Sequence, residues 1–523
     1  MAIAGTAHGA PAAASSSDQA RGAPMCAANE VPTNAVGRSV PFNGLLATNG
    51  TPATERTVAA NGTPASDLTV AANRTPGFDA LLAANGAPGS RDELFGDAPA
   101  KPDNGDAREK LFGDQPAPRS GPSWRGFVRG ELAYTYAQPA HWSKMLVRGE
   151  LDGEGALTDT IKYHIGARLD YDFVYDATDF YPPDVRRDQR VDFLLRENYL
   201  DIGAGDWDFR LGRQHVVWGE MVGLFFADVV SAKDLREFVL PDFDVLRIPQ
   251  WATRTEYFKG DFHAEAVWIP VPTYDNIGKP GAEFFPALPP PPPGFATLFS
   301  NEQFPRRTLG HTNVGARVSY LHNGWDGSAF YYNSMDAAPT FYRQVVLSPQ
   351  PAFIYEARHD RIDQVGGTLA KDLGAAVFKT EVVYTRGRSY NVLRLTDDDG
   401  VVRQNTLDIV GGLDFTLPAD TRLNVQLFNR TFFDHDPDIV PDRNESGFSV
   451  LVNHKLSDRF QAEVLYISSV NRTDWMVRPR LIWDFQRNWQ LIAGADIFGG
   501  PPLGFFGQYD NRDRVYTEVR YSF

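Results

Sequence analysis

Arginines and aspartates that could form ion pairs gather in one region of the sequence. Arg213 and Arg247 are separated by an apolar stretch, and Asp228, Asp234 and Asp244 lie between them. A guanidinium can bind a carboxylate through two parallel hydrogen bonds, so Arg is suited to pairing away from water. Such pairs could clamp the stretch in place or form a ligand site, and we favour the clamp.

Other charged residues recur at every second position. Arg168, Asp170 and Asp172 share one face of an extended segment, and Arg210 lies in another such segment. Charged side chains that face a water-filled lumen tune selectivity in barrel channels. The sequence therefore predicts a set of pore or constriction residues: Arg168, Asp170, Asp172, Arg210, Arg213, Asp228, Asp234 and Arg247.

Patterns of known catalytic and metal sites are absent from the sequence. It contains no Walker loop, HExxH, GxSxG or EF-hand pattern, and none of its 10 histidines has ligand spacing. Ser449 with Asn453 and His454 is the one candidate cluster for a hydrolase, but Ser449 and His454 have opposite strand parity. Residues 397–399 are acidic and could bind a divalent ion that bridges lipopolysaccharide, although a solvated loop tip is favoured. We expect no enzyme, cofactor or metal site.

The last residues indicate the elements that position these side chains. Val515, Thr517, Val519, Tyr521 and Phe523 share one face of a strand, and polar residues alternate with them. Such alternation up to a terminal aromatic is typical of the closing strand of an outer-membrane β-barrel. That strand must pair with the first one, since a free edge in lipid would leave backbone groups unsatisfied. Phe523 is therefore predicted to close the barrel.

The same alternation recurs through residues 124–523. In the segment 161–176, Leu169 and Tyr171 are expected to face lipid and Arg168 and Asp170 the lumen, and its length predicts that it projects beyond the rim. Counting such segments gives an all-β fold, a transmembrane antiparallel up-and-down β-barrel of about 18 strands. Tryptophans at strand ends would form aromatic girdles: Trp124, Trp207, Trp325, Trp475 and Trp489.

Connection lengths predict how the barrel is oriented. Short connections such as 203–206 and 259–261 alternate with long ones such as 219–247 and 271–311. Barrels in the outer membrane have short periplasmic turns and long external loops. This orientation places the C-terminus and residues 1–123 in the periplasm. The two long loops are rich in apolar residues, and 219–247 is expected to fold into the barrel as a constriction, with a helix over 232–239 capped by Ser231. The alternative is a lid over neighbouring loops.

Composition limits the remaining possibilities. No run of 18 apolar residues exists, so a transmembrane helix is excluded, and the net charge of −15 argues against a nucleic-acid partner. Residues 1–123 are rich in Ala, Gly, Pro, Asn and Thr and contain a repeat of the Asn-Gly-Thr-Pro type, which predicts a disordered tail. The first twenty residues lack the apolar stretch of an export signal. We expect that the start codon is wrongly assigned or that the signal is missing from the sequence given.

Residues 212–258 carry a family resemblance. Gly212-Arg213-Gln214, Trp218-Gly219, Asp228-Val229, Asp234-Leu235 and Arg247-Ile248-Pro249 resemble the recurring elements of a large proteobacterial family of porin-like outer-membrane barrels with a domain of unknown function. Ser231-Ala232 departs from the Asn-Pro that the family more often has, and residues 131–143 fit the same family. The resemblance implies a self-contained barrel, recognition of Phe523 by the barrel assembly machinery, and movement of hydrophobic compounds or lipids in concert with an inner-membrane exporter.

These observations predict a porin-like channel or transporter for a hydrophobic or amphipathic solute, with loops 219–247 and 271–311 constricting or capping the pore. Its surroundings would be outer-membrane lipid and lipopolysaccharide. Two alternatives remain open: a surface structural or adhesion barrel that acts through its outer loops, and a membrane-embedded lipid hydrolase.

Overall fold

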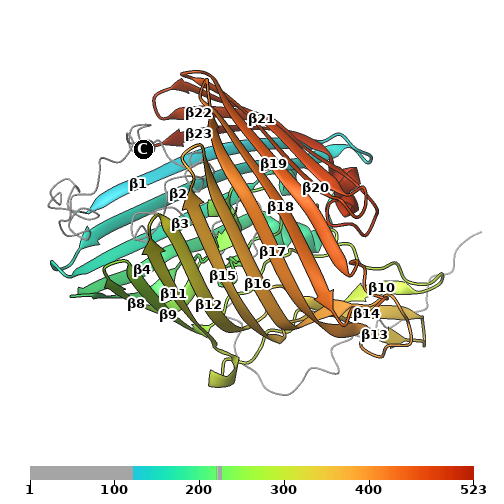
Figure 1. Cartoon of the computed structure of the whole chain (residues 1–523). Coiled ribbons are helices and arrows are strands. Elements are labelled where there is room, and N and C mark those ends of the chain that lie inside the picture. The colour runs from blue at the N-terminus through green and yellow to red at the C-terminus, as the bar shows by residue number, and fades with distance from the viewer. Residues whose placement is uncertain (1–121, 220, 222–226) are drawn as a thin grey trace, which may run out of the picture. The chain divides into compact units, whose positions relative to one another are not determined.

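The protein forms a closed β-barrel. The structure, a computed structural model, describes residues 122–219, 221 and 227–523. Its 18-stranded antiparallel sheet joins each strand to the next barrel strand along the chain, and β1 (Ser123–Thr135) pairs with β23 (Arg514–Ser522) (Figure 1). The predicted fold is thus confirmed. The calls on residues 1–121, including the repeat and the periplasmic tail, fall outside the described residues.

The elements between the first and last strand follow in chain order. The other barrel strands are β2 (His141–Ala156), β3 (Ile161–Asp172), β4 (Val191–Ala204), β5 (Trp207–Gln214), β8 (Gln250–Lys259), β9 (Phe262–Val271), β11 (Asn313–His322), β12 (Trp325–Met335), β15 (Arg361–Asp372), β16 (Ala376–Asn391), β17 (Val401–Leu417), β18 (Thr421–Phe433), β19 (Asn444–Ser457), β20 (Phe460–Ser469), β21 (Trp475–Gln486) and β22 (Trp489–Gly499).

Smaller elements lie in the connections. They are α4 (Val174–Ala177), α5 (Pro183–Gln189), β6 (Ala232–Lys233), α6 (Phe243–Leu246), β7 (Arg247–Ile248), β10 (Ala296–Phe299), η1 (Leu309–His311), β13 (Thr340–Val346), β14 (Ala352–Arg358) and η2 (Gly507–Arg512). No helix among the described residues is long and apolar enough to cross a membrane.

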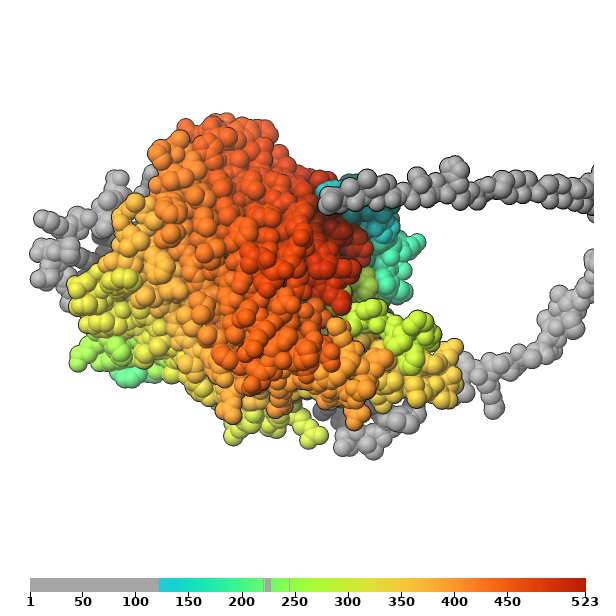
Figure 2. Space-filling view, turned by 45° about the vertical axis from the view of Figure 1, so that its right-hand side comes forward, coloured from blue at the N-terminus to red at the C-terminus, as the bar shows by residue number. Residues whose placement is uncertain are grey.

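The strands form because successive side chains meet two different environments. On β1, Val128 and Leu132 are exposed on the outer face, whereas Arg129 and Glu131 are buried on the inner face. The same apolar exposure continues along the C-terminal strands, whose outer surface is drawn in orange and red in Figure 2. A contiguous apolar outer band around a charged interior is the arrangement of a transmembrane barrel. The chain is therefore an outer-membrane β-barrel.

The connections alternate in length as predicted. One end of the barrel carries short turns, such as 205–206, 260–261 and 323–324, and the other end carries long connections, such as 173–190, 215–249 and 272–312. The connections 136–140 and 470–474 are short although they lie at the long-loop end. Trp124, Trp207, Trp325 and Trp489 begin strands at the short-turn end and are partly exposed, as expected for a girdle.

The terminal residue closes the sheet as predicted. The backbone N–H of Phe523 donates to the carbonyl of Gly126 at 2.9 Å, and the N–H of Gly126 donates to the carbonyl of Phe523 at 2.9 Å. A side chain at position 126 would collide with the Phe523 ring, so glycine allows this ring to lie against β1.

One strand is shorter than predicted. The segment 161–176 leaves the sheet at Asp172 and turns into α4, so it does not continue as a strand beyond the rim. The Asp172 carboxylate accepts hydrogen bonds from the backbone N–H groups of Val174 at 3.0 Å and Met145 at 2.9 Å. These side-chain hydrogen bonds replace backbone bonds between neighbouring strands and turn the chain. The alternation of polar and apolar residues in the sequence does not reveal such a turn.

A separate sheet lies beyond the barrel strands at the long-loop end. Its strands are β10, β14 and β13, and Figure 1 shows them at the lower right, past the ends of β16–β18. Phe285, Leu288 and Phe295 from the connection 272–312 pack against Phe341 and Phe353 of this sheet. We call this sheet and its packed residues 285–299 the cover.

Candidate functional site

The connection between β5 and β8 enters the lumen. Gln214 and Gln250 are register partners, so a tight turn could have joined these strands. Instead the described residues of this connection, 215–219, 221 and 227–249, hereafter the plug, carry apolar side chains against the inner wall. Trp218 is fully buried and contacts Phe330 and Tyr332 of β12, with ring centroids 5.3 and 5.7 Å away. The same cluster contains Val216, Ala227, Val230, Ala252, Val267, Ile269 and Val383.

The far part of the plug packs on the opposite wall. Phe238 and Leu240 join a cluster with Ile467 of β20, Met476 of β21 and Phe498 of β22. In the circular strand order, β9 and β21 lie across the barrel from each other. The plug therefore spans the lumen, and the inward fold predicted for loop 219–247 is confirmed for its described residues, whereas 220 and 222–226 lie outside them.

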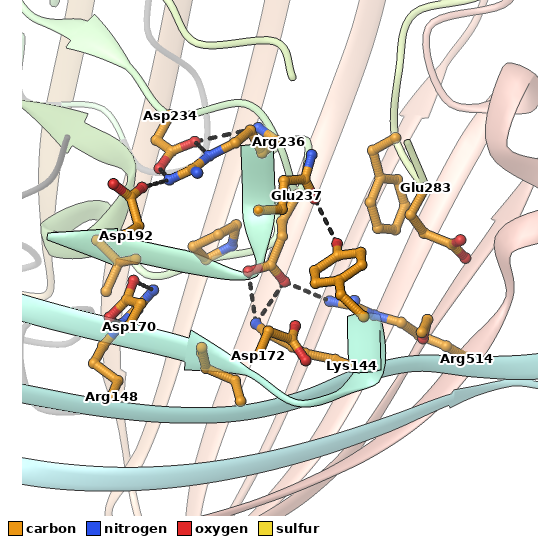
Figure 3. A pocket seen from close by; sticks show the side chains of 17 residues that line it. Lys144, Arg148, Asp170, Asp172, Asp192, Asp234, Arg236, Glu237, Glu283 and Arg514 are labelled. Carbon is orange, nitrogen blue, oxygen red and sulfur yellow. Dashed lines mark hydrogen bonds and ion pairs between the residues drawn. The ribbon is translucent and has the colours of Figure 1, made fainter. Parts of the chain in front are cut away.

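Ion pairs fasten the plug to the wall. Glu237 binds Lys144 Nζ of β2 at 2.6 Å and Arg514 of β23 at 3.4 Å, and Figure 3 shows its carboxylate between these two cations. Arg236 binds Asp192 of β4 at 2.6 Å. Hydrogen bonds between a cationic side chain and a carboxylate are short and strong.

Two more contacts hold the plug, one through backbone N–H groups and one through an ion pair. The Glu381 carboxylate of β16 accepts the backbone N–H groups of Met221 at 2.9 Å and Ala227 at 3.0 Å. Asp242 of the plug binds Arg480 of β21 at 3.3 Å. The plug is thus bonded to at least five barrel strands, which makes it a fixed part of this conformation.

The predicted helix over 232–239 is wrong. Ala232 and Lys233 form β6, which pairs with Ile248 and Arg247 of β7, and the helix of this region is the short α6. Ser231 donates its hydroxyl to the Val216 carbonyl at 3.1 Å. Backbone partners outside the segment therefore replace the i to i−4 bonds that a helix would need.

The predicted clamp is partly confirmed. Arg247 Nε binds Asp228 Oδ2 at 2.9 Å, as expected for a pair that braces the plug. Asp234 binds Arg236, a neighbour in its own turn, through contacts of 2.8 and 2.7 Å. Arg213 donates to the Leu195 carbonyl at 2.9 Å. The side chain of Asp244 lies outside the described set.

The predicted wall residues face the interior. Arg168 is 1% exposed and Asp170 6%, whereas Leu169 between them is 52% exposed, so the predicted faces of this strand are confirmed. Asp170 binds Arg148 Nη2 at 2.7 Å and Arg168 Nε at 3.3 Å. Asp170 is thus shared by two arginines, and these ion pairs differ from a free selectivity ring.

Arg210 and Asp172 have structural partners as well. Arg210 binds Asp201 at 2.6 Å and lies 4.1 Å above the centre of the Tyr199 ring. Asp172 caps the turn described above. Whether any of these residues meets a solute stays a prediction.

Sequence reasoning missed the wall partners of the plug. Lys144, Glu381, Arg480 and Arg514 face the lumen by strand parity, but dozens of other charged residues do too. Glu381 and Met221 are 160 positions apart in the chain. Only the closed barrel brings such residues together.

Two cavities border the plug. One of about 60 Å³ lies against β2 and β3, where Lys144, Arg148, Asp170, Arg236 and Glu237 line it (Figure 3). The other measures about 410 Å³ and lies between the plug and the inner wall of β12 and β15–β18. Its described lining is Asp228, Val229, Ser231, Lys233, Asp275, Ser334, Asp336, Ala337, Ala338, Pro339, Thr340, Ile362, Gln364, Arg388, Ser389, Tyr390, Asn391, Asp408 and Arg430.

The other predicted sites show no catalytic or metal-binding arrangement. Ser449 is buried on the inner face, and His454 has the opposite parity and lies 2.7 Å from the Thr421 hydroxyl. Asp397 binds Arg394 at 3.1 Å and caps the N–H of Gly400. In the described part of the chain, no group of three or more His, Cys, Asp or Glu residues could hold a metal ion.

One protein family matches the part of the chain that contains the plug. A family model described as a protein of unknown function, DUF1302, matches residues 146–411, which is half of the chain. The chain belongs to this family. Residues 131–143 also resemble the family, but they lie outside the match. Among the DUF1302 motif residues, Gly212 has φ 133° and a Cβ there would collide with Asn198 and Tyr199, so β5 needs glycine beside β4.

Solved outer-membrane proteins share low similarity with this chain. Acinetobacter baumannii OccAB2 has 12% identity and a TM-score of 0.46, with 77% of this chain and 98% of that chain covered. Pseudomonas aeruginosa OccK8 (OprE) has 10% identity and a TM-score of 0.45 over 77% and 97%. Salmonella typhi OmpF, solved with daunomycin, has 9% identity and a TM-score of 0.41 over 77% and 97%. No curated protein matches the chain.

Proposed function

We propose that this porin-like outer-membrane barrel is a channel or transporter for an amphipathic solute, with the plug as its constriction. The observation that carries the proposal is the path of residues 215–249, which cross the lumen and contact both walls. A segment that only shaped the surface would have no need of partners on β9 and β21. The charged inner face supplies a wet path around the plug.

The solute class rests on where polar and apolar groups lie. The plug's apolar side chains are packed on the walls, and the cavities beside it are lined mostly by polar groups. Exposed apolar side chains are found instead at and near the cover, in Leu298, Phe299, Phe304 and Leu347. An amphipathic molecule suits both regions, whereas a purely hydrophobic one would leave the cavity groups unpaired.

Removal of the plug tests the proposal directly. Because Gln214 and Gln250 are register partners, residues 216–248 can be replaced by a short Gly-Ser turn without altering the barrel register. In planar bilayers we expect a several-fold larger single-channel conductance than in the intact protein. Shortening the exposed segment 305–309 is the matched control and should leave conductance nearly unchanged. Folded barrels that never conduct, with or without the plug, would refute a channel.

A surface role is the second candidate, favoured by the exposed apolar side chains near the cover. An adhesion barrel predicts that trimming residues 296–311 abolishes binding to cells or matrix without changing permeability. Cooperation with an inner-membrane exporter, contact with lipopolysaccharide and insertion by the barrel assembly machinery stay predictions.

A further inference from the structure

The larger cavity is closed on one side by the plug and on the other by the barrel wall. Its volume of about 410 Å³ falls within the range of small-molecule sites. It lies toward the long-loop end, because its wall residues Ser334, Gln364 and Arg388 are near the ends of β12, β15 and β16 that carry long connections. A solute that enters from that side meets this cavity beside the plug.

The charges that line the cavity are paired. Arg388 binds Asp336 through contacts of 2.7 and 3.3 Å, and Arg430 binds Asp408 at 2.5 Å. On the plug side, Asp228 is bound by Arg247 at 2.9 Å. An ion of either sign that entered this lining would lose its hydration and find each fixed charge already matched.

The fourth carboxylate of the lining is also held. Asp275 accepts the backbone N–H of Lys233 at 2.7 Å, and Lys233 supplies a cation beside it. Burial raises the pKa of Asp275 above its ordinary value. With Arg247 counted, each of the four carboxylates therefore has a cation beside it.

Hydrogen-bonding capacity remains after these pairs are made. Asp228 is 4% exposed, and its Oδ1 has no hydrogen-bond partner among the described residues. The buried hydroxyl of Tyr390 likewise lacks one within the described part. Ser334 adds a hydroxyl to the lining, and Asn391 adds its side-chain carbonyl, since the Asn391 amide nitrogen already donates to the carbonyls of Phe341 and Gly400. A buried polar atom without a partner is unfavourable, so a ligand or water that bonds to these atoms would stabilise the site.

We propose that this cavity binds the polar part of the transported solute, and that this part is uncharged and hydroxylated, of the sugar class. The proposal rests on the channel function above and adds the chemistry of its solute. A hydroxyl both donates and accepts, so it satisfies a carboxylate oxygen and a phenol alike. Neutral hydroxyls also cost less to desolvate than an ion.

Three probes of nearly equal size separate charge from shape. Glucose, glucuronate and glucosamine share a pyranose ring and in a mildly acidic buffer carry net charges of 0, −1 and +1, and their binding to the full-length protein in lipid nanodiscs can be measured by titration calorimetry. We expect glucose to bind at least ten-fold more tightly than either ion. Equal binding of the three, or no binding of glucose, would overturn the proposal.

Charge variants supply a readout that loss of folding cannot imitate. Asp408→Asn removes the carboxylate bound to Arg430, so glucuronate should gain at least ten-fold relative to glucose. Arg388→Gln removes the cation bound to Asp336 and should shift the preference toward glucosamine. Asp414→Asn is the matched control, since Asp414 has the same strand parity on β17 but lies outside the cavity. Unchanged preferences in both folded variants would refute the site.

The two proposals can fail separately. Glucose binding by a barrel that never conducts would refute the channel and keep the site. Conductance that rises on plug removal, in a protein that ignores glucose, would refute the site and keep the channel.

Discussion

Substitution of Leu169 by arginine tests which face of β3 meets lipid. Leu169 is 52% exposed on the outer face, and Tyr163 and Tyr171 bracket it on the same face. Tyrosines of this kind sit at the two membrane interfaces. The change Leu169→Arg therefore places a cation inside the apolar band while the inner face stays intact.

The cost follows from the depth of the side chain. At about 3.4 Å per residue, the strand rises about 27 Å from Tyr163 to Tyr171. A tilt of about 40° turns this into about 21 Å of depth, close to the apolar band of about 25 Å in such barrels. Leu169 then lies about 5 Å below the level of Tyr171, and Ala167 about 10 Å below it, near the midplane.

A lipid-facing arginine costs about 2–4 kcal/mol at the midplane and about 0–1 kcal/mol near an interface. We therefore expect Leu169→Arg to lower the free energy of unfolding by about 2 kcal/mol, and Ala167→Arg by about 3 kcal/mol. Reversible urea unfolding of the barrel in lipid vesicles measures both. Leu169→Ala is the control for loss of the leucine side chain. Equal costs for the two arginines, or no cost for either, would refute the depth assignment.

Three further predictions concern an ion pair of the wall, the closure of the barrel and the anchoring of the plug. Arg168→Leu leaves the buried Asp170 paired with Arg148 alone and should cost about 1–3 kcal/mol, so a neutral result would contradict the pairing. Deletion of Phe523 removes two backbone hydrogen bonds to Gly126 and should lower the amount of heat-modifiable barrel in outer membranes, whereas unchanged levels would mean closure without it. Burial raises the pKa of Glu237, but Lys144 and Arg514 outweigh burial and hold this pKa below its usual range. The stability contributed by the Glu237 anchor is therefore complete above about pH 4.3 and is lost as the pH falls through the lowered pKa of Glu237. Conductance should then rise on acidification. Glu237→Gln should conduct more at neutral pH and respond less to acid.

The barrel itself was predictable because lipid outside and water inside require apolar and polar residues to alternate along each strand. On β3, Leu169 and Arg168 are neighbours that meet lipid and interior, and parity alone assigns them. Connection lengths were equally local, since each turn is read from the residues between two strands. The end of β3 at Asp172 could not be predicted locally, because it depends on the backbone N–H of Met145 on β2.

The plug shows where local reading fails. The periodicity of residues 232–239 suits a helix, yet Asp234 donates its backbone N–H to Leu246 and Leu235 donates to Asn276. These partners come from the plug's return path and from another connection, and they outweigh the weak intrinsic preference of a short helix. No pattern within the segment carries that information.

The apolar content of the plug also changes meaning in the structure. In sequence, the two apolar loops over one pore suggested a hydrophobic or amphipathic solute. Trp218 and Phe238, however, are buried against opposite walls, so their burial stabilises the plug instead of contacting cargo. A segment that crosses a wet lumen needs such contacts at both ends to hold one position. The composition of the plug therefore reports how it is anchored, and the chemistry of the solute has to be inferred from the polar cavity left beside it.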